Sequence, residues 1–116
     1  MPAPMVKNLS ELVKTCNMPW MRYFIKYDPT ESIKAARCPV MAVNGEKDTQ
    51  IAAETNLNAI KNLLPDNSAN AIKEYPGLNH LFQQCTTGNV NEYSQIEQTI
   101  SPEVLKDITG WINKVK

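Results

Sequence analysis

Apolar positions divide the chain into helical stretches at both ends and two short apolar runs between them. Near the N-terminus, apolar residues recur at helical spacing from Leu9 to Cys16, and aromatic residues repeat that spacing from Trp20 to Tyr27. The pattern predicts two short amphipathic helices. We interpret the aromatic face of the second helix as part of a core, while lining of an acyl pocket stays open as an alternative.

The middle of the chain has the pattern of a strand, a helix and a second strand. Residues 39–43 are continuously apolar, which is typical of a strand covered on both faces. Helical spacing follows over 53–64, and 71–75 is a more polar run, as expected nearer a sheet edge. Because a strand, crossover helix and strand place the two strands in parallel, we expect an α/β fold built on a βαβ unit.

A final helix is predicted after Pro102, because a proline suits the first helical position and apolar residues then recur up to Val115. This helix should pack on the sheet. We divide the chain into an N-terminal helical, cap-like segment at 1–36 and an α/β portion at 37–116.

Composition excludes several classes of function. Twelve basic residues balance twelve acidic ones without a long run of either sign. Charge therefore indicates neither a nucleic-acid nor a membrane partner. No apolar run approaches the roughly twenty residues that span a bilayer, and residues 1–12 lack the apolar stretch of a secretory signal, so we expect a cytoplasmic location. Three cysteines and one histidine fit neither a disulfide framework nor a metal site, and we expect no cofactor.

Two loops that follow the predicted strands carry residues with catalytic chemistry, Asp48 and His80. Parallel neighbours end at the same sheet edge, about 5 Å apart, where open α/β sheets bind ligands. A carboxylate there can orient an imidazole and stabilise its cation while the imidazole takes a proton from a nucleophile. Taken singly, Asp48 would also suit a turn and His80 a structural role.

The sequence contains N-G-E-K-D at 44–48 and G-L-N-H-L-F-Q at 77–83, with P-W-M-R-Y-F at 19–24, Y-D-P at 27–29, C-P-V at 38–40 and I-S-P-E-V-L at 100–105. From about residue 17 onward, these motifs resemble the C-terminal region of bacterial α/β-hydrolases, in the dienelactone-hydrolase-like branch of serine esterases and peptidase-like enzymes. The resemblance implies a partial α/β-hydrolase fold, a small acyl-ester, thioester or amide substrate, and an acyl-enzyme intermediate. It also implies that Asp48 is the triad acid and His80 the general base.

The nucleophile of that family is missing from the chain. Its G-x-S-x-G turn surrounds none of the five serines, Ser10, Ser32, Ser68, Ser94 and Ser101. Cys85 leaves a cysteine–histidine alternative open, although its position after the histidine favours an inert thiol. We therefore expect the C-terminal portion of a serine hydrolase, inactive alone, which would be an enzyme only if a missing N-terminal part supplies the nucleophile.

The alternative is a non-catalytic, self-associating α/β module. The strand at 39–43 has no predicted neighbour along one edge, and free strand edges pair with other strands. We expect this edge either to form a homo-oligomer, such as a symmetric dimer, or to dock on the missing N-terminal part.

Overall fold

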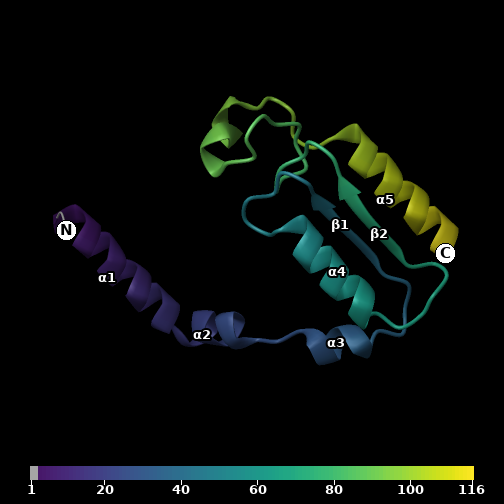
Figure 1. The fold of residues 1–116 in the computed structure, drawn as a ribbon, viewed down its shortest axis with the longest axis horizontal. Helices are drawn as coiled ribbons and strands as arrows, with labels where there is room; N and C mark the ends of the chain where they lie inside the picture. The colour runs from purple at the N-terminus through teal and green to yellow at the C-terminus, as the bar shows by residue number, and fades with distance from the viewer. Residues whose placement is uncertain (1–2) are drawn as a thin grey trace. The chain divides into compact units, whose positions relative to one another are not determined.

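A computed structural model describes residues 3–116 (Figure 1). Its elements are α1 (Ala3–Asn17), α2 (Pro19–Lys26), α3 (Thr30–Lys34), β1 (Met41–Gly45), α4 (Ala53–Leu63), β2 (Ala71–Tyr75), the 3-10 helix η1 (Val90–Gln95) and α5 (Pro102–Val115). The chain divides into two compact units, the first ending at Glu31 and the second spanning Ser32–Lys116. The second unit contains the sheet and both loops that carry the candidate site.

The helices α1 and α2 of the N-terminal unit bury none of their described side chains. Trp20 stacks on Phe24 and Tyr23 lies against Tyr27, each pair with ring centroids 5.7 Å apart. These four rings are 48–69% exposed. Each ring contacts its neighbour one turn away on the helix surface, so the prediction that this aromatic face packs into a core is not borne out within the N-terminal unit itself.

The sheet of the second unit consists of β1 and β2 in parallel, joined through α4, as the sequence predicts. The register pairs Met41 with Ala71 at one end and Gly45 with Tyr75 at the other. Both strands thus end at the same sheet edge, and the two loops that follow them begin side by side.

The bounds and burial of β1 differ from the prediction. The sequence predicts this strand at 39–43, two residues too early. Pro39 has no backbone N–H, and the N–H of Val40 is bound by Asn70 Oδ1 at 2.9 Å, so the strand begins after both residues. Only Gly45 of β1 is buried. The other four residues are partly buried, and among the described residues β1 has a neighbouring strand, β2, along one edge only.

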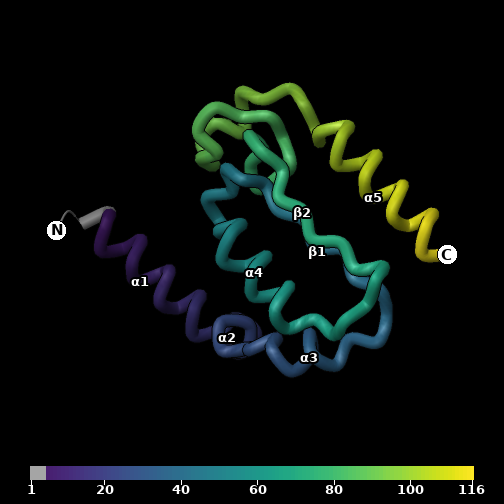
Figure 2. Tube along the Cα trace, turned by 45° about the vertical axis from the view of Figure 1, so that its right-hand side comes forward, coloured from purple at the N-terminus to yellow at the C-terminus, as the bar shows by residue number. Residues whose placement is uncertain are grey.

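The helices α4 and α5 lie on opposite faces of the sheet (Figures 1 and 2). Side chains alternate between the two faces along β2. Ile72 lies on the α4 face near Leu57, and Tyr75 lies on the α5 face with Val104. The core cluster on the α5 face consists of Tyr75, Leu78 and Val104, with Val43, Phe82, Ile100 and Ile108 packed against it. The core thus surrounds the carboxyl end of β2 and anchors the loop that follows.

The helix α5 packs on the sheet as predicted and is also tied to it by polar contacts. Asp107 accepts hydrogen bonds from Lys73 Nζ at 2.5 Å and from Tyr75 Oη at 2.9 Å. Burial, together with this bond to Asp107, raises the pKa of Tyr75 to about 12. Farther along the helix, Trp111 Nε1 donates to the carbonyl of Ala69 at 2.7 Å. These contacts fix α5 against both ends of β2.

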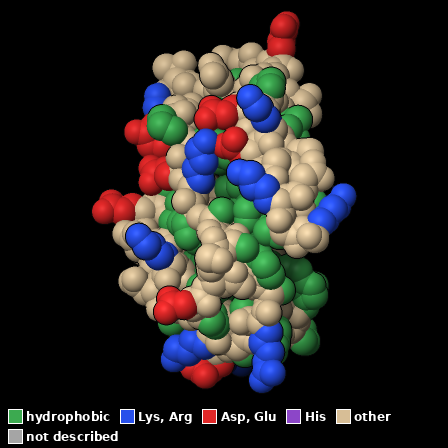
Figure 3. Space-filling view, turned by 90° about the vertical axis from the view of Figure 1, so that its right-hand side faces the viewer, with side chains coloured by type: hydrophobic (Ala, Val, Ile, Leu, Met, Phe, Trp, Pro, Cys, Tyr) green, Lys and Arg blue, Asp and Glu red, His purple; other side chains and the backbone are tan. Residues whose placement is uncertain are grey.

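The surface beside α5 is partly apolar. A cavity of about 700 Å³ there is lined by residues that include Met41, Trp111 and Lys114. On the face shown in Figure 3, hydrophobic side chains gather between lysine and arginine side chains. Within residues 3–116, no helix combines the length and apolar character needed to cross a bilayer.

The segment between β2 and α5 contains η1, which the sequence analysis does not predict. Glu92 in this helix accepts hydrogen bonds from the N–H of Thr86 at 2.7 Å and the N–H of Thr87 at 2.8 Å. The hydroxyl of Thr49 donates to Gly88 O at 3.1 Å. The segment is thus held by side-chain contacts against the loop that carries Asp48, and such contacts leave no periodic pattern in the sequence.

Candidate functional site

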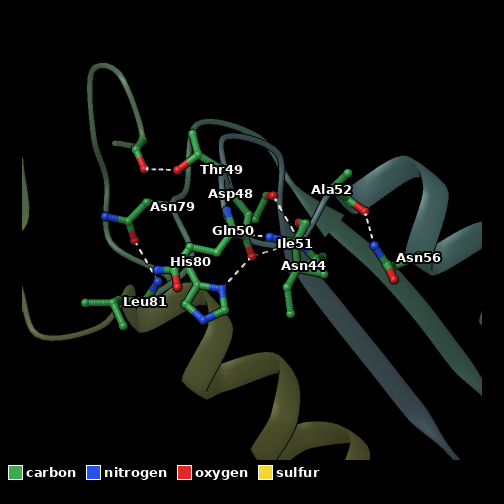
Figure 4. Close-up of polar contacts among 12 residues, drawn as sticks. Asn44, Asp48, Thr49, Gln50, Ile51, Ala52, Asn56, Asn79, His80 and Leu81 are labelled. Carbon is green, nitrogen blue, oxygen red and sulfur yellow. Dashed lines mark hydrogen bonds and ion pairs between the residues drawn. The ribbon is translucent and has the colours of Figure 1, made fainter. Parts of the chain in front are cut away.

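Asp48 lies in the turn after β1, and its carboxylate has donors on both oxygens. The side chain is 5% exposed. Oδ1 accepts hydrogen bonds from the N–H groups of Gln50 and Ile51, both at 2.9 Å. Oδ2 accepts from His80 Nδ1 at 2.8 Å and from Asn44 Nδ2 at 3.2 Å (Figure 4). Four donors therefore fix the plane of this carboxylate.

Opposing effects act on the pKa of Asp48. Burial, the largest effect, raises this pKa, because the charged form loses water. The hydrogen bonds from Ile51, His80 and Gln50 stabilise the charged form and together outweigh burial, so the pKa lies below the ordinary value of 3.8. Asp48 is therefore a carboxylate at neutral pH and an acceptor toward His80.

His80 lies in the loop after β2, with its ring one-third exposed. Nδ1 points at Asp48, while Nε2 points away from it (Figure 4). Because Asp48 is ionised and can only accept, the hydrogen bond assigns the proton of the neutral ring to Nδ1. Nε2 makes no hydrogen bond to any residue within 3–116, so its lone pair is free to accept a proton.

The two loops approach each other closely at Gly45. A Cβ atom at this position would lie 2.4 Å from Leu78 O and 2.5 Å from Asn79 O. The N–H of Lys47 donates to Leu78 O at 2.8 Å, and the N–H of Gly77 donates to Glu46 Oε2 at 2.7 Å. Backbone contact therefore sets the distance between the loops, and this distance places Asp48 beside His80.

The loop around His80 is fixed by a buried amide pair. Asn79 is fully buried, and its Nδ2 donates to Gln83 Oε1 at 3.0 Å. Asn79 Oδ1 accepts from the N–H of Leu81 at 2.9 Å and the N–H of Gln83 at 3.0 Å. The loop then turns at Phe82, whose φ of 56° is unusual for a residue other than glycine. These bonds hold the backbone on both sides of His80.

Within the part of the chain that the structure describes, no hydroxyl or thiol is hydrogen-bonded to Nε2 of His80. The thiol of Cys85 instead donates to Gly77 O at 3.4 Å. Burial and the nearby charge of Glu92 raise the pKa of this thiol, which disfavours a reactive thiolate. The described residues therefore place a carboxylate against the imidazole but no hydroxyl or thiol on Nε2.

At the site, no group of side chains among residues 3–116 could hold a metal ion, and the cavities along α4 and α5 lie elsewhere. Among residues 3–116, no three His, Cys, Asp or Glu side chains are grouped so that they could hold a metal ion. A cavity of about 600 Å³ lies along α4 and that of about 700 Å³ along α5, and neither is lined by Asp48 or His80.

No protein-family model matches the chain, and the searches of curated proteins and of solved structures also find no match.

Sequence reasoning identified the pair in this site but not the residues that hold it. Asp48 and His80 lie where the ends of two parallel strands place them. Asn44, Asn79 and Gln83 were absent from the candidate residues, although each makes side-chain hydrogen bonds within the two loops. The signal in the sequence was the presence of three amide side chains in the two motifs that contain the pair. Amide side chains in such loops commonly bind nearby backbone groups.

Proposed function

We propose that Asp48 and His80 are the acid and the general base of a serine-hydrolase relay, and that the chain is the C-terminal portion of an α/β-hydrolase. The observation that carries the proposal is the 2.8 Å bond between Asp48 Oδ2 and His80 Nδ1, with Nε2 free. The substrate class is a small acyl ester or amide.

In this reaction, Nε2 of His80 takes the proton of a hydroxyl as its oxygen attacks the substrate carbonyl. The same proton then passes to the leaving alcohol or amine, which separates as the acyl-enzyme forms. Asp48 stays ionised, keeps the ring in its Nδ1–H tautomer and stabilises the imidazolium. The attacking hydroxyl belongs to polypeptide outside this sequence.

Two further observations support the proposal. The order acid then histidine along the chain is that of α/β-hydrolases, and both residues lie in motifs that resemble that family. The parallel strands end beside each other, and both residues follow these ends in the crevice region where α/β sheets bind ligands.

The test compares the chain with a longer polypeptide that includes the coding sequence directly upstream of Met1. The chain alone should hydrolyse a short-chain p-nitrophenyl ester no faster than its His80→Ala variant. The longer polypeptide should hydrolyse it, and kcat should fall by about 10⁶-fold in His80→Ala and by about 10⁴-fold in Asp48→Asn. Asp66→Asn, at an exposed loop carboxylate, is the matched control and should leave kcat unchanged.

Turnover by the chain alone that disappears with His80→Ala would show a nucleophile within these residues and overturn the proposal of a shared site. A longer polypeptide that lacks G-x-S-x-G and shows no turnover would argue against a hydrolase and in favour of a structural role.

A second candidate function, a self-associating module, is favoured by a different observation. Among the described residues, β1 pairs only with β2, so one edge of β1 has no strand beside it. An added strand from a second copy would satisfy the backbone groups of that edge.

A further inference from the structure

We propose that Asn44 is a positioning residue for the Asp48–His80 pair, an inference that rests on the function proposed for that pair. Asn44 is the fourth residue of β1, and its side chain reaches the turn that carries Asp48 (Figure 4). It would act through Asp48, with no contact to substrate.

The contacts of Asn44 decide which way its amide points. Nδ2 lies 3.2 Å from Asp48 Oδ2, 3.1 Å from Ile51 O and 3.3 Å from Gly45 O. All three neighbours are acceptors, so the nitrogen and not the oxygen of the amide must face them. One side chain thus connects the end of β1, the acid and the end of the turn.

The two oxygens of Asp48 are held in different ways. Oδ1 is held by two backbone N–H groups of its own turn, at Gln50 and Ile51. Oδ2, the oxygen that binds His80, has one other donor among residues 3–116, the Asn44 amide. Without Asn44, the oxygen that orients the imidazole would be held only by the imidazole itself, and the turn would lose its bond at Ile51 O.

The expected consequence is a change in the tautomer of His80. A neutral imidazole in water favours the proton on Nε2, whereas the bond to Asp48 places it on Nδ1 and leaves Nε2 as the base. A carboxylate that is less firmly held enforces the Nδ1–H form less strongly. Loss of one side-chain hydrogen bond should change the tautomer ratio by roughly three- to tenfold toward Nε2–H.

The experiment reads the tautomer directly, because His80 is the only histidine. Its two ring nitrogens are followed by ¹⁵N NMR in the neutral state for the wild-type chain, Asn44→Ala and Asn44→Leu, which fills a similar volume without a donor. Asn56→Ala is the control, because it removes a 2.8 Å bond from Asn56 Nδ2 to Ala52 O away from His80. Amide dispersion in the same samples shows that each variant is folded.

We expect Nδ1–H in the wild type and in Asn56→Ala, and a shift toward Nε2–H in both Asn44 variants. An unchanged tautomer in a folded Asn44 variant would overturn the positioning role while leaving the acid–base pair intact. An Nε2–H wild type would instead overturn the proposed function itself.

If neither Asn44 variant folds, a measurement on the wild type can still contradict the inference. The side-chain amide protons of Asn44 should exchange with water more slowly than those of exposed Asn58, because only the former are hydrogen-bonded. Equal exchange rates would show that the amide does not hold the carboxylate in solution and would overturn the proposal.

Discussion

The lack of a side chain at Gly45 allows the two loops of the site to lie close together. Its φ does not demand glycine, but a Cβ would collide with the carbonyl oxygens of Leu78 and Asn79. Neither oxygen is the end of a flexible side chain, so any relief must move the backbone next to His80. The N-G-E-K-D motif therefore needs its glycine because of the neighbouring loop.

We predict that Gly45→Ala lowers the free energy of unfolding by about 2 kcal/mol or more, because backbone must shift to admit the methyl group. Gly110→Ala is the matched control. No atom outside its own helix backbone lies within 4 Å of a Cβ at Gly110, and alanine is the better helix former, so this variant should gain about 0.5–1 kcal/mol. Urea denaturation measures both, and equal effects would contradict the close approach.

The lowered pKa of Asp48 predicts a pH dependence of stability. A carboxyl whose folded pKa lies below its unfolded value of about 3.8 to 3.9 stabilises the fold above that value. This stabilisation is lost as the pH falls through the lower, folded pKa. The difference in unfolding free energy between the wild type and Asp48→Asn should therefore shrink as the pH falls from about 5 toward 2.

Chemical denaturation at several pH values measures this difference, with Asp66→Asn as a control that should show no comparable pH dependence. A gap between the wild type and Asp48→Asn that does not change with pH would mean that the folded state gains nothing from ionising Asp48.

Asp48 and His80 were predictable as neighbours because strand topology alone brings the two loops to one edge. Asn44 and Asn79 were not, because their roles depend on which groups lie within hydrogen-bonding distance of each amide, and periodicity carries no such information.

At the scale of elements, the accuracy of the predicted bounds differs from one segment to the next. The helix after Pro102 and the strand 71–75 were predicted at the bounds that the structure shows. The start of β1 was misplaced because an apolar pattern cannot show that the N–H of Val40 binds the Asn70 side chain, so that only the carbonyl of Val40 bonds to β2, at Ala71. The 3-10 helix η1 was missed because it depends on the bonds to Glu92 rather than on an apolar stripe.

The free edge of β1 leads to a prediction about association. If the edge pairs with a second copy, Met41→Lys should weaken dimer formation, because a charged lysine on an edge strand opposes pairing. Ile112→Lys, at an exposed position of α5, should leave association unchanged. Sedimentation velocity over a range of concentrations measures both. A wild-type chain that stays monomeric throughout would argue against edge pairing.

At the scale of the whole molecule, the sequence predicted the class of fold but not where its apolar surface lies. A mixed α/β arrangement with a parallel sheet follows from the order of apolar runs. The exposure of the aromatic residues of α2 does not, because a helical stripe has the same pattern whether or not another surface covers it. The sequence therefore identifies the faces that can be buried and leaves open which of them are.

The contact between Asp48 and His80 depends on the parallel register of β1 and β2, so it forms only when the two strands pair correctly. A shift of one residue would move His80 by about 3.3 Å along the sheet relative to Asp48 and turn the side chains of β2 to the opposite face. Tyr75 would then leave the core, and the imidazole would lose its carboxylate in the same event. Misaligned chains would thus be both poorly packed and unable to orient their base, so folding errors would be excluded from any chemistry that this pair performs.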